Sequence, residues 1–345
     1  MCNIAGYVGT KPAAPILIEM LRKQEGLDAG CYTGIATIHE GKIYYAKVVG
    51  DLEQLLSRTD AASLPGTIGI IHSRTPGDTG DEWAHPFVCE KNGEYMTALV
   101  ANGTVGCFTH REPDYIKIAE SLLAEGYHMR SALPSNGKKW TLTDNTRVHL
   151  TDVLCQLMSK KIVDGADTVT AMMEGYQEIS IENIGLLLSV TEPDAISWAR
   201  INFPMHRGVA PHGTYLATAP QAFPEDAGEP YLLPVLSAGL IKKDSFTCRR
   251  FENPPATVAP FSARVRAESY RAICEALREG GKTVPDLGKV VKPLFDEADC
   301  LQIGAAIYGA LYEIDRQGRL KVERGYKPGV YEHLKAPVFY MSMEE

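Results

Sequence analysis

Met1-Cys2-Asn3-Ile4-Ala5-Gly6 opens the chain and decides how the rest of it is interpreted. Removal of Met1 by an aminopeptidase, which accepts a small second residue such as cysteine, would leave Cys2 with both a thiol and a free α-amine. Free thiols and α-amines titrate near about 8.5 and about 8, so both groups lie close to neutral pH. The amine can take the thiol proton and return it to a leaving amine, as attack on an amide bond requires. We therefore expect Cys2 to be a nucleophile.

The composition is that of a globular protein with room for two domains. The chain has 345 residues, 45% hydrophobic and 23% charged, with a net charge of -8. This acidic balance argues against nucleic-acid binding. The longest aliphatic run, Ile184 to Val190, is too short to cross a bilayer. We expect a cytoplasmic protein without a membrane anchor.

The cysteines are scattered and contain no Cys-x-x-Cys pair, which argues against a zinc site and a disulfide framework. We therefore expect a reducing compartment, no bound metal and no cofactor. The eight cysteines stand at positions 2, 31, 89, 107, 155, 248, 274 and 300.

Apolar patterning predicts strands and helices in separate blocks over residues 1–255. Blocks of this kind predict an α+β fold in which sheets lie between helical layers. The expected strands are 4–8, 32–39, 43–49, 67–72, 95–101, 184–191, 196–203, 214–218 and a pair within 235–250. The expected helices are 14–21, 114–126, 151–163 and 167–176.

A second unit is expected over residues 256–345, after a proline-rich stretch at 253–260. It contains three expected helices followed by one strand, an order found in winged-helix DNA-binding modules. Its 13 basic and 13 acidic residues give a net charge of zero, so we expect a dimerising or capping role rather than DNA binding. The helices are 263–279, 284–295 and 301–316, and the strand is 319–323.

Four short motifs together resemble the glutaminase domain of class II glutamine amidotransferases. They are the opening Cys2-Asn3-Ile4-Ala5-Gly6, His72-Ser73-Arg74, Ala84-His85-Pro86 and Ala101-Asn102-Gly103. Their order and spacing are similar to the family's, and the resemblance extends to about residue 255. It implies an N-terminal-nucleophile (Ntn) hydrolase fold, a four-layer αββα sandwich, here followed by a small and mostly helical C-terminal domain.

The motifs supply the residues that amide hydrolysis needs. The side-chain amide of Asn102 and the backbone N–H of Gly103 are suited to an oxyanion hole, although Asn-Gly is also a common hairpin turn. The resemblance implies that Arg74 holds the substrate's α-carboxylate, which a planar guanidinium can do with two parallel hydrogen bonds. We expect His72 and His85 to set loop geometry through ring hydrogen bonds rather than to act as bases.

The sequence departs from the family pattern around the pocket. Asn3 replaces a glycine, and the stretch Asp28-Ala29-Gly30-Cys31-Tyr32 lacks the family's arginine and aspartate. Leu150 stands where the family has an aspartate for the substrate's ammonium, with Asp144 and Asp152 as possible substitutes. After Arg74, a glycine-rich loop at 75–80 has a different composition from the family's.

The expected function is therefore that of a glutamine amidotransferase-type hydrolase, which converts glutamine to glutamate and ammonia. Its expected partners are a small-molecule amide substrate, a separate ammonia-accepting synthase subunit and further copies of itself as a homo-oligomer. Two alternatives stay open, an Ntn amidase with a substrate other than glutamine and a non-catalytic sensor that keeps the fold.

Overall fold

The computed structural model describes residues 2–77, 80–104, 115–137, 141–179, 182–255, 258–260, 262–296 and 302–344. Its central strand, β1 (Asn3–Gly9), pairs antiparallel on one side with β4 (Ile68–Arg74) and on the other with β12 (Gly213–Ala217). The described strands form two large sheets. The first has the order β13 (Tyr231–Leu232), β11 (His206–Ala210), β12, β1, β4, β2 (Tyr32–His39) and β3 (Lys42–Val49).

The second sheet stacks on the first through an apolar layer. Ile4 and Val8 of β1 belong to this layer, whereas Ala5 and Tyr7 face the helices on the other side. Both faces of β1 are thus buried, which explains its apolar sequence from Ile4 to Val8. The second sheet has the order β15 (Arg249–Arg250), β14 (Ser237–Ile241), β10 (Ile196–Arg200), β9 (Glu182–Ser189), β6 (Glu94–Thr104) and β5 (Phe87–Lys91).

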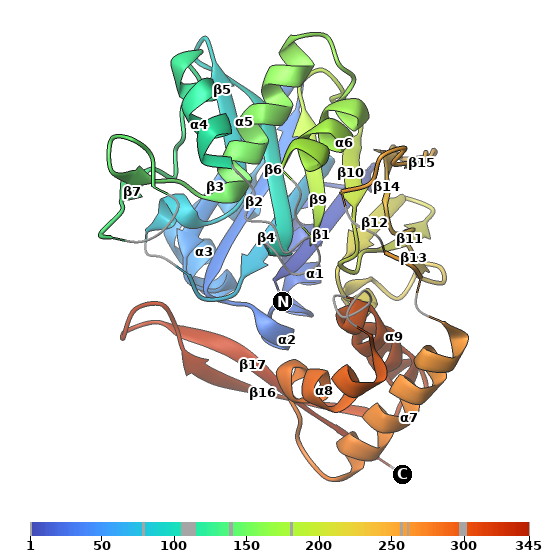
Figure 1. Cartoon of the computed structure of the whole chain (residues 1–345). Helices are drawn as coiled ribbons and strands as arrows, with labels where there is room; N and C mark the ends of the chain where they lie inside the picture. The colour runs from blue at the N-terminus through green and yellow to red at the C-terminus, as the bar shows by residue number, and fades with distance from the viewer. Residues whose placement is uncertain are drawn as a thin grey trace.

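Helices cover the outer face of each sheet (Figure 1). On the first sheet, α1 (Ala13–Arg22) and α3 (Leu52–Arg58) enclose an apolar core with β1. On the second, α4 (Tyr115–Ala124), α5 (Leu150–Val163) and α6 (Thr168–Glu178) enclose another. The predicted four-layer αββα sandwich is confirmed.

The described residues between 263 and 343 form a C-terminal module of helices and one hairpin. The helices α7 (Ala263–Arg278), α8 (Val284–Val291) and α9 (Ile303–Arg316) pack on the hairpin of β16 (Leu320–Pro328) and β17 (Lys335–Met343). Between α7 and α8, Lys282 pairs with Met341 of β17 through two backbone hydrogen bonds of 2.8 Å. None of the helices among the described residues is long and apolar enough to cross a membrane.

Several elements differ from the sequence prediction. The single strand expected at 319–323 is wrong, because two nine-residue strands form a hairpin there. Most of β16 is exposed and lacks apolar alternation, and β17 contains a proline, so neither strand carries a clear signal. Helix α3 was also missed, although Asp51 caps it by accepting the N–H of Gln54 at 3.1 Å.

The hairpin rests on the short helix α2 (Glu25–Asp28) and the residues that follow it. A Cβ on Gly26 would lie 2.5 Å from the Phe339 ring, and one on Gly30 would lie 2.3 Å from Pro337. Gly30 also has a φ of +90°, which favours glycine. Glycine at both positions therefore allows the hairpin to approach this segment closely.

Two ion pairs join the same surfaces. Arg324 of β16 lies 3.1 Å from the fully buried Glu25, and Lys327 lies 3.9 Å from Asp28. Burial raises the pKa of Glu25 to about 7, although the Leu52 N–H and Arg324 both oppose this shift. In the unfolded chain the same carboxyl titrates near about 4.3. Between these two values the folded protein holds a proton that the unfolded chain has lost.

We predict that the carboxyl of Glu25 makes the folded protein less stable as the pH rises from about 5 to about 7.5, because in this range the unfolded chain binds fewer protons than the native state. In Glu25→Gln, which cannot ionise, this loss disappears. Urea unfolding of both proteins across this range should therefore show the wild type losing stability relative to Glu25→Gln. The exposed Glu19→Gln serves as the control, with a constant offset from the wild type. A constant offset for Glu25→Gln as well would contradict the prediction.

Candidate active site

Cys2 lies at the start of β1, at the end of the sandwich that faces the C-terminal module (Figure 1). Because Asn3 pairs with Ser73, the antiparallel register brings the end of β4 beside Cys2. The Sγ atom of Cys2 lies 3.7 Å from Oγ1 of Thr75, the first residue after β4. Cys2 is half-buried, so a small reagent can reach it. Thr75 was not among the predicted site residues.

Asn102 approaches Cys2 from the second sheet. Its Nδ2 donates a 2.8 Å hydrogen bond to the backbone carbonyl oxygen of Cys2, and its side chain is buried. This bond uses one of the two amide N–H groups, and the other has no partner among the described residues. Gly103 follows on β6 and is exposed. The predicted oxyanion donor Asn102 is therefore adjacent to the predicted nucleophile, and Gly103 is its next residue on the strand.

A histidine connects the two sheets at this point. Nε2 of His72 on β4 donates to the carbonyl oxygen of Ala101 on β6 at 3.1 Å. This bond holds the strand end that carries Arg74 against the strand end that carries Asn102. His72 therefore sets local geometry, as its sequence context predicts.

Arg74 is held in place by aromatic rings and one carbonyl. Its guanidinium carbon lies 5.0 Å from the centre of the Tyr32 ring, and Nη1 donates to the carbonyl oxygen of Trp83 at 3.1 Å. A Cβ on Gly77 would lie 2.6 Å from Nη2, so the loop after β4 passes close over the guanidinium. No carboxylate among the described residues forms an ion pair with Arg74. The remaining N–H groups can bind an incoming carboxylate.

The rings of His72, His85 and His149 form a cluster behind the site. The ring centres of His72 and His85 lie 3.9 Å apart, and His149 stacks on Phe87 at 4.7 Å. Burial lowers the pKa of His72 to about 3 and the pKa values of His85 and His149 well below the usual range. All three are neutral at pH 7 and are poor general bases. His85 has no hydrogen-bond partner among the described residues, so the ring hydrogen bonds expected for it are wrong.

The positions considered for binding a substrate ammonium do not offer a free carboxylate. Asp152 is buried and accepts hydrogen bonds from the N–H and hydroxyl of Ser131, both at 2.8 Å, and from Gln156 at 3.1 Å. Asp144 is exposed and accepts from the backbone N–H and hydroxyl of Thr146. Leu150 packs against the apolar core of α4, α5 and α6. Asp144 and Asp152 therefore serve the local fold, and the recognition of an ammonium group stays open.

Ser131 also links Asp152 to Arg74 through Trp83. Its carbonyl oxygen accepts the indole N–H of Trp83 at 2.8 Å, and Trp83 in turn accepts from Arg74 through its backbone carbonyl. The buried aspartate thus positions the tryptophan that supports Arg74. Trp83 stands just before the Ala84-His85-Pro86 motif, which is the signal that could have identified it.

The C-terminal module covers Asn3, the residue that follows Cys2. Asn3 and Tyr308 of α9 are both fully buried. Burial raises the pKa of the Tyr308 phenol. The nearby Cys2 adds to this rise, and the neighbouring Asn3 amide opposes it. The Asn3 amide and the Tyr308 hydroxyl have no well-formed hydrogen bond with each other or with any other described residue. Asn3, which departs from the family pattern, is therefore accommodated beneath α9, a contact that local sequence could not reveal.

Comparisons with known proteins agree with this arrangement. The chain is 30% identical over 253 residues to glutamine–fructose-6-phosphate aminotransferase from Caldanaerobacter subterraneus subsp. tengcongensis, covering 71% of this chain and 36% of that protein. It is 28% identical over 260 residues to the protein of the same name from Chlorobaculum tepidum, and this match covers 73% of this chain and 38% of that protein. The relation to class II glutamine amidotransferases is confirmed. The chain spans little more than a third of the length of these relatives, which are named as enzymes.

Solved structures support the fold alone. Glutamine phosphoribosylpyrophosphate amidotransferase from B. subtilis superimposes with a TM-score of 0.57 at 14% identity, covering 89% of this chain and 64% of that one. An allosteric regulatory enzyme of purine biosynthesis superimposes with a TM-score of 0.57 at 15% identity, and the match covers 89% of this chain and 63% of that one. No family model matches the chain.

We predict that removing the Tyr308 ring exposes Cys2. Tyr308→Ala should increase the rate of Cys2 alkylation by iodoacetamide several-fold, because the space above Asn3 opens to solvent. Tyr308→Phe keeps the ring and should leave the rate unchanged. Tyr312→Ala, one turn further along α9, is the matched control. Peptide mapping by mass spectrometry measures the rate at Cys2 alone, and an unchanged rate in Tyr308→Ala would contradict the prediction.

Proposed function

We propose that the chain, once Met1 is removed, hydrolyses a carboxamide in the manner of a class II glutamine amidotransferase, with glutamine as substrate. The observation that carries the proposal is the convergence of Cys2, Asn102 and Arg74 from three strands of two sheets. A protein that only binds a ligand has no need of an amide donor beside a thiol. The names of the curated relatives agree with this chemistry.

The proposed mechanism uses groups of the chain alone. The Cys2 thiol loses its proton to its own α-amine, and the sulfur attacks the carboxamide carbon. Asn102 and the N–H of Gly103 stabilise the negative oxygen of the tetrahedral intermediate. The protonated amine then gives its proton to the leaving nitrogen, which departs as ammonia. Water hydrolyses the resulting thioester and releases the acid.

Arg74 is the proposed binding residue for the substrate's α-carboxylate. Stacking on Tyr32 and the bond to Trp83 fix the plane of its guanidinium, so little side-chain entropy remains to be lost on binding. No carboxylate among the described residues forms an ion pair with Arg74, so a bound carboxylate would be its counter-ion. The histidine cluster lies too deep and is too weakly basic to replace the α-amine as base.

One observation favours a second candidate, an amidase with a substrate other than glutamine. Leu150 packs into an apolar core, and Asp152 is fully buried and already accepts three hydrogen bonds. A buried ammonium without a carboxylate partner costs several kcal/mol, roughly, in lost hydration. A substrate that has a carboxylate and a carboxamide but lacks the α-ammonium avoids this cost.

The partners and location remain proposals. We propose a separate protein as the acceptor of the released ammonia, a homo-oligomeric assembly and a cytoplasmic location. We do not propose DNA binding, because α9, the helix that would enter a groove in a winged-helix module, is largely buried against the sandwich and the hairpin.

Covalent labelling tests the proposal. The processed protein is incubated with the glutamine analogue diazo-oxo-norleucine, and the adduct is located by peptide mapping. We expect a single adduct at Cys2, no adduct at this position in Cys2→Ser, and release of glutamate from glutamine by the wild type. Labelling without glutamate release would favour the second candidate. Processed protein that is not labelled would overturn the enzymatic proposal.

We also predict that Arg74 recognises the carboxylate rather than activating the thiol. In Arg74→Ala, labelling by diazo-oxo-norleucine should slow by about 10- to 100-fold, the usual effect of losing a charge-assisted hydrogen bond. Alkylation of Cys2 by neutral iodoacetamide should be nearly unchanged. Arg58→Ala, an exposed arginine paired with Asp81, is the control. Equal slowing of both reagents would contradict a role in carboxylate binding.

A further inference from the structure

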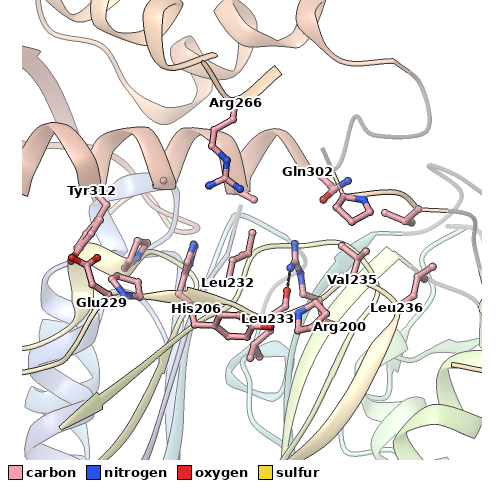
Figure 2. Close-up of a pocket in the computed structure, with 18 of the residues that line it drawn as sticks. Arg200, His206, Glu229, Leu232, Leu233, Val235, Leu236, Arg266, Gln302 and Tyr312 are labelled. Carbon is pink, nitrogen blue, oxygen red and sulfur yellow. Dashed lines mark hydrogen bonds between the residues drawn. The ribbon is translucent and has the colours of Figure 1, made fainter. Parts of the chain in front are cut away.

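A cavity of about 670 Å³ lies between the sandwich and the C-terminal module, at a place separate from Cys2 (Figure 2). One wall comes from β10, β11 and the segment around β13 and β14, and the other from α7 and α9. Its volume is within the range of small-molecule sites. Neither Cys2 nor Arg74 lines it, so it is not the proposed substrate pocket.

A buried guanidinium forms part of the sandwich wall. Arg200, the last residue of β10, is 1% exposed. Its Nε donates to the carbonyl oxygen of Phe203 at 2.7 Å, Nη2 donates to that of Asn202 at 3.0 Å, and Nη1 donates to that of Leu233. Burial lowers its pKa to about 9, with no carboxylate opposing this shift, so it stays charged at neutral pH. A buried charge balanced only by carbonyl dipoles is costly, and an anion nearby would offset that cost.

A second arginine faces the same cavity from the other module. Figure 2 shows Arg266 pointing from α7 into the cavity, toward His206 and Arg200 on the opposite wall. Burial and the positive charges of Arg200 and Arg266 lower the pKa of His206 to about 3, which places the three side chains in one electrostatic cluster. His206 is therefore neutral, and its Nδ1 donates to the carbonyl oxygen of Thr218 at 3.1 Å. The two arginines give this part of the cavity a positive potential.

The acidic residues at the rim pair with an arginine that does not line the cavity. Glu229 and Glu313 line the cavity, but Arg316 lies 2.9 Å from one and 3.1 Å from the other. The two carboxylates share this one arginine, and three arginines, Arg200, Arg250 and Arg266, line the cavity against these two acidic residues.

The rest of the cavity is suited to an apolar group. Leu232, Val235, Phe251 and Val258 contribute apolar side chains, and Ala305 and Gly309 of α9 leave space on the opposite wall. We propose that this cavity binds a small organic anion, a phosphate or carboxylate on an apolar body, between Arg200 of the sandwich and Arg266 of the C-terminal module. Such a ligand would contact both parts of the chain.

Isothermal titration of the full chain with three probes of similar shape tests the proposal. Phenyl phosphate and benzoate carry the two anionic groups, and benzyl alcohol is the neutral counterpart. We expect one binding site for an anionic probe and much weaker binding of benzyl alcohol, and the tighter of the two anions identifies the preferred group. Because Arg200 supports the fold, the diagnostic variant is Arg266→Ala on the exposed face of α7, which should weaken anion binding about tenfold or more.

Arg271→Ala is the matched control, since Arg271 is exposed on the same helix and does not line this cavity. It should bind the anion as the wild type does. Failure of both anions to bind, equal binding of benzyl alcohol, or unchanged binding in Arg266→Ala would overturn the proposal. None of these measurements depends on Cys2, so they are independent of the proposed hydrolase activity.

Discussion

The antiparallel pairing of β1 between β4 and β12 is the constraint on which the site depends. It fixes the first residues of the chain inside a sheet, where Ile4 exchanges hydrogen bonds with Thr218 and its carbonyl also accepts from Gln24 at 3.2 Å. A chain terminus is usually mobile, and a nucleophile there would have no defined position. The register with β4 places Cys2 beside Thr75 and Arg74, and the bond from His72 to Ala101 brings Asn102 in from the second sheet.

The C-terminal module explains two departures from the family pattern. The segment after α1 lacks the family's charged residues, and here it forms the surface on which the hairpin rests, with Gly26 and Gly30 allowing close contact. Asn3 lies beneath Tyr308 of α9. Both changes lie where the sandwich meets the module. The sequence around Cys2 therefore departs from the family pattern at the surface that the module covers.

The αββα layers were predictable because the strands and helices of the sandwich have strong apolar periodicity, and the site because four short motifs preserve their order. The hairpin was not predictable, since β16 is mostly exposed and polar. The same holds for contacts that join distant parts of the chain, such as Tyr308 with Asn3 and Trp83 with Ser131. Asp152 illustrates the limit well, because its sequence position allowed a substrate role, whereas in the structure it is fully buried and its carboxylate accepts three hydrogen bonds from Ser131 and Gln156. The domain boundary near residue 255 stays a prediction.

The most direct measurement is the rate of ammonia release from a panel of small carboxamides, glutamine first, by the Met1-processed wild type and by Cys2→Ala. We predict hydrolysis of at least one carboxylate-bearing carboxamide by the wild type and a loss of about three orders of magnitude or more in the variant, as for other enzymes that lose their nucleophile. Hydrolysis that survives in Cys2→Ala, or a wild type inactive on every carboxamide, would contradict the assignment of Cys2 as the nucleophile of an amide hydrolase.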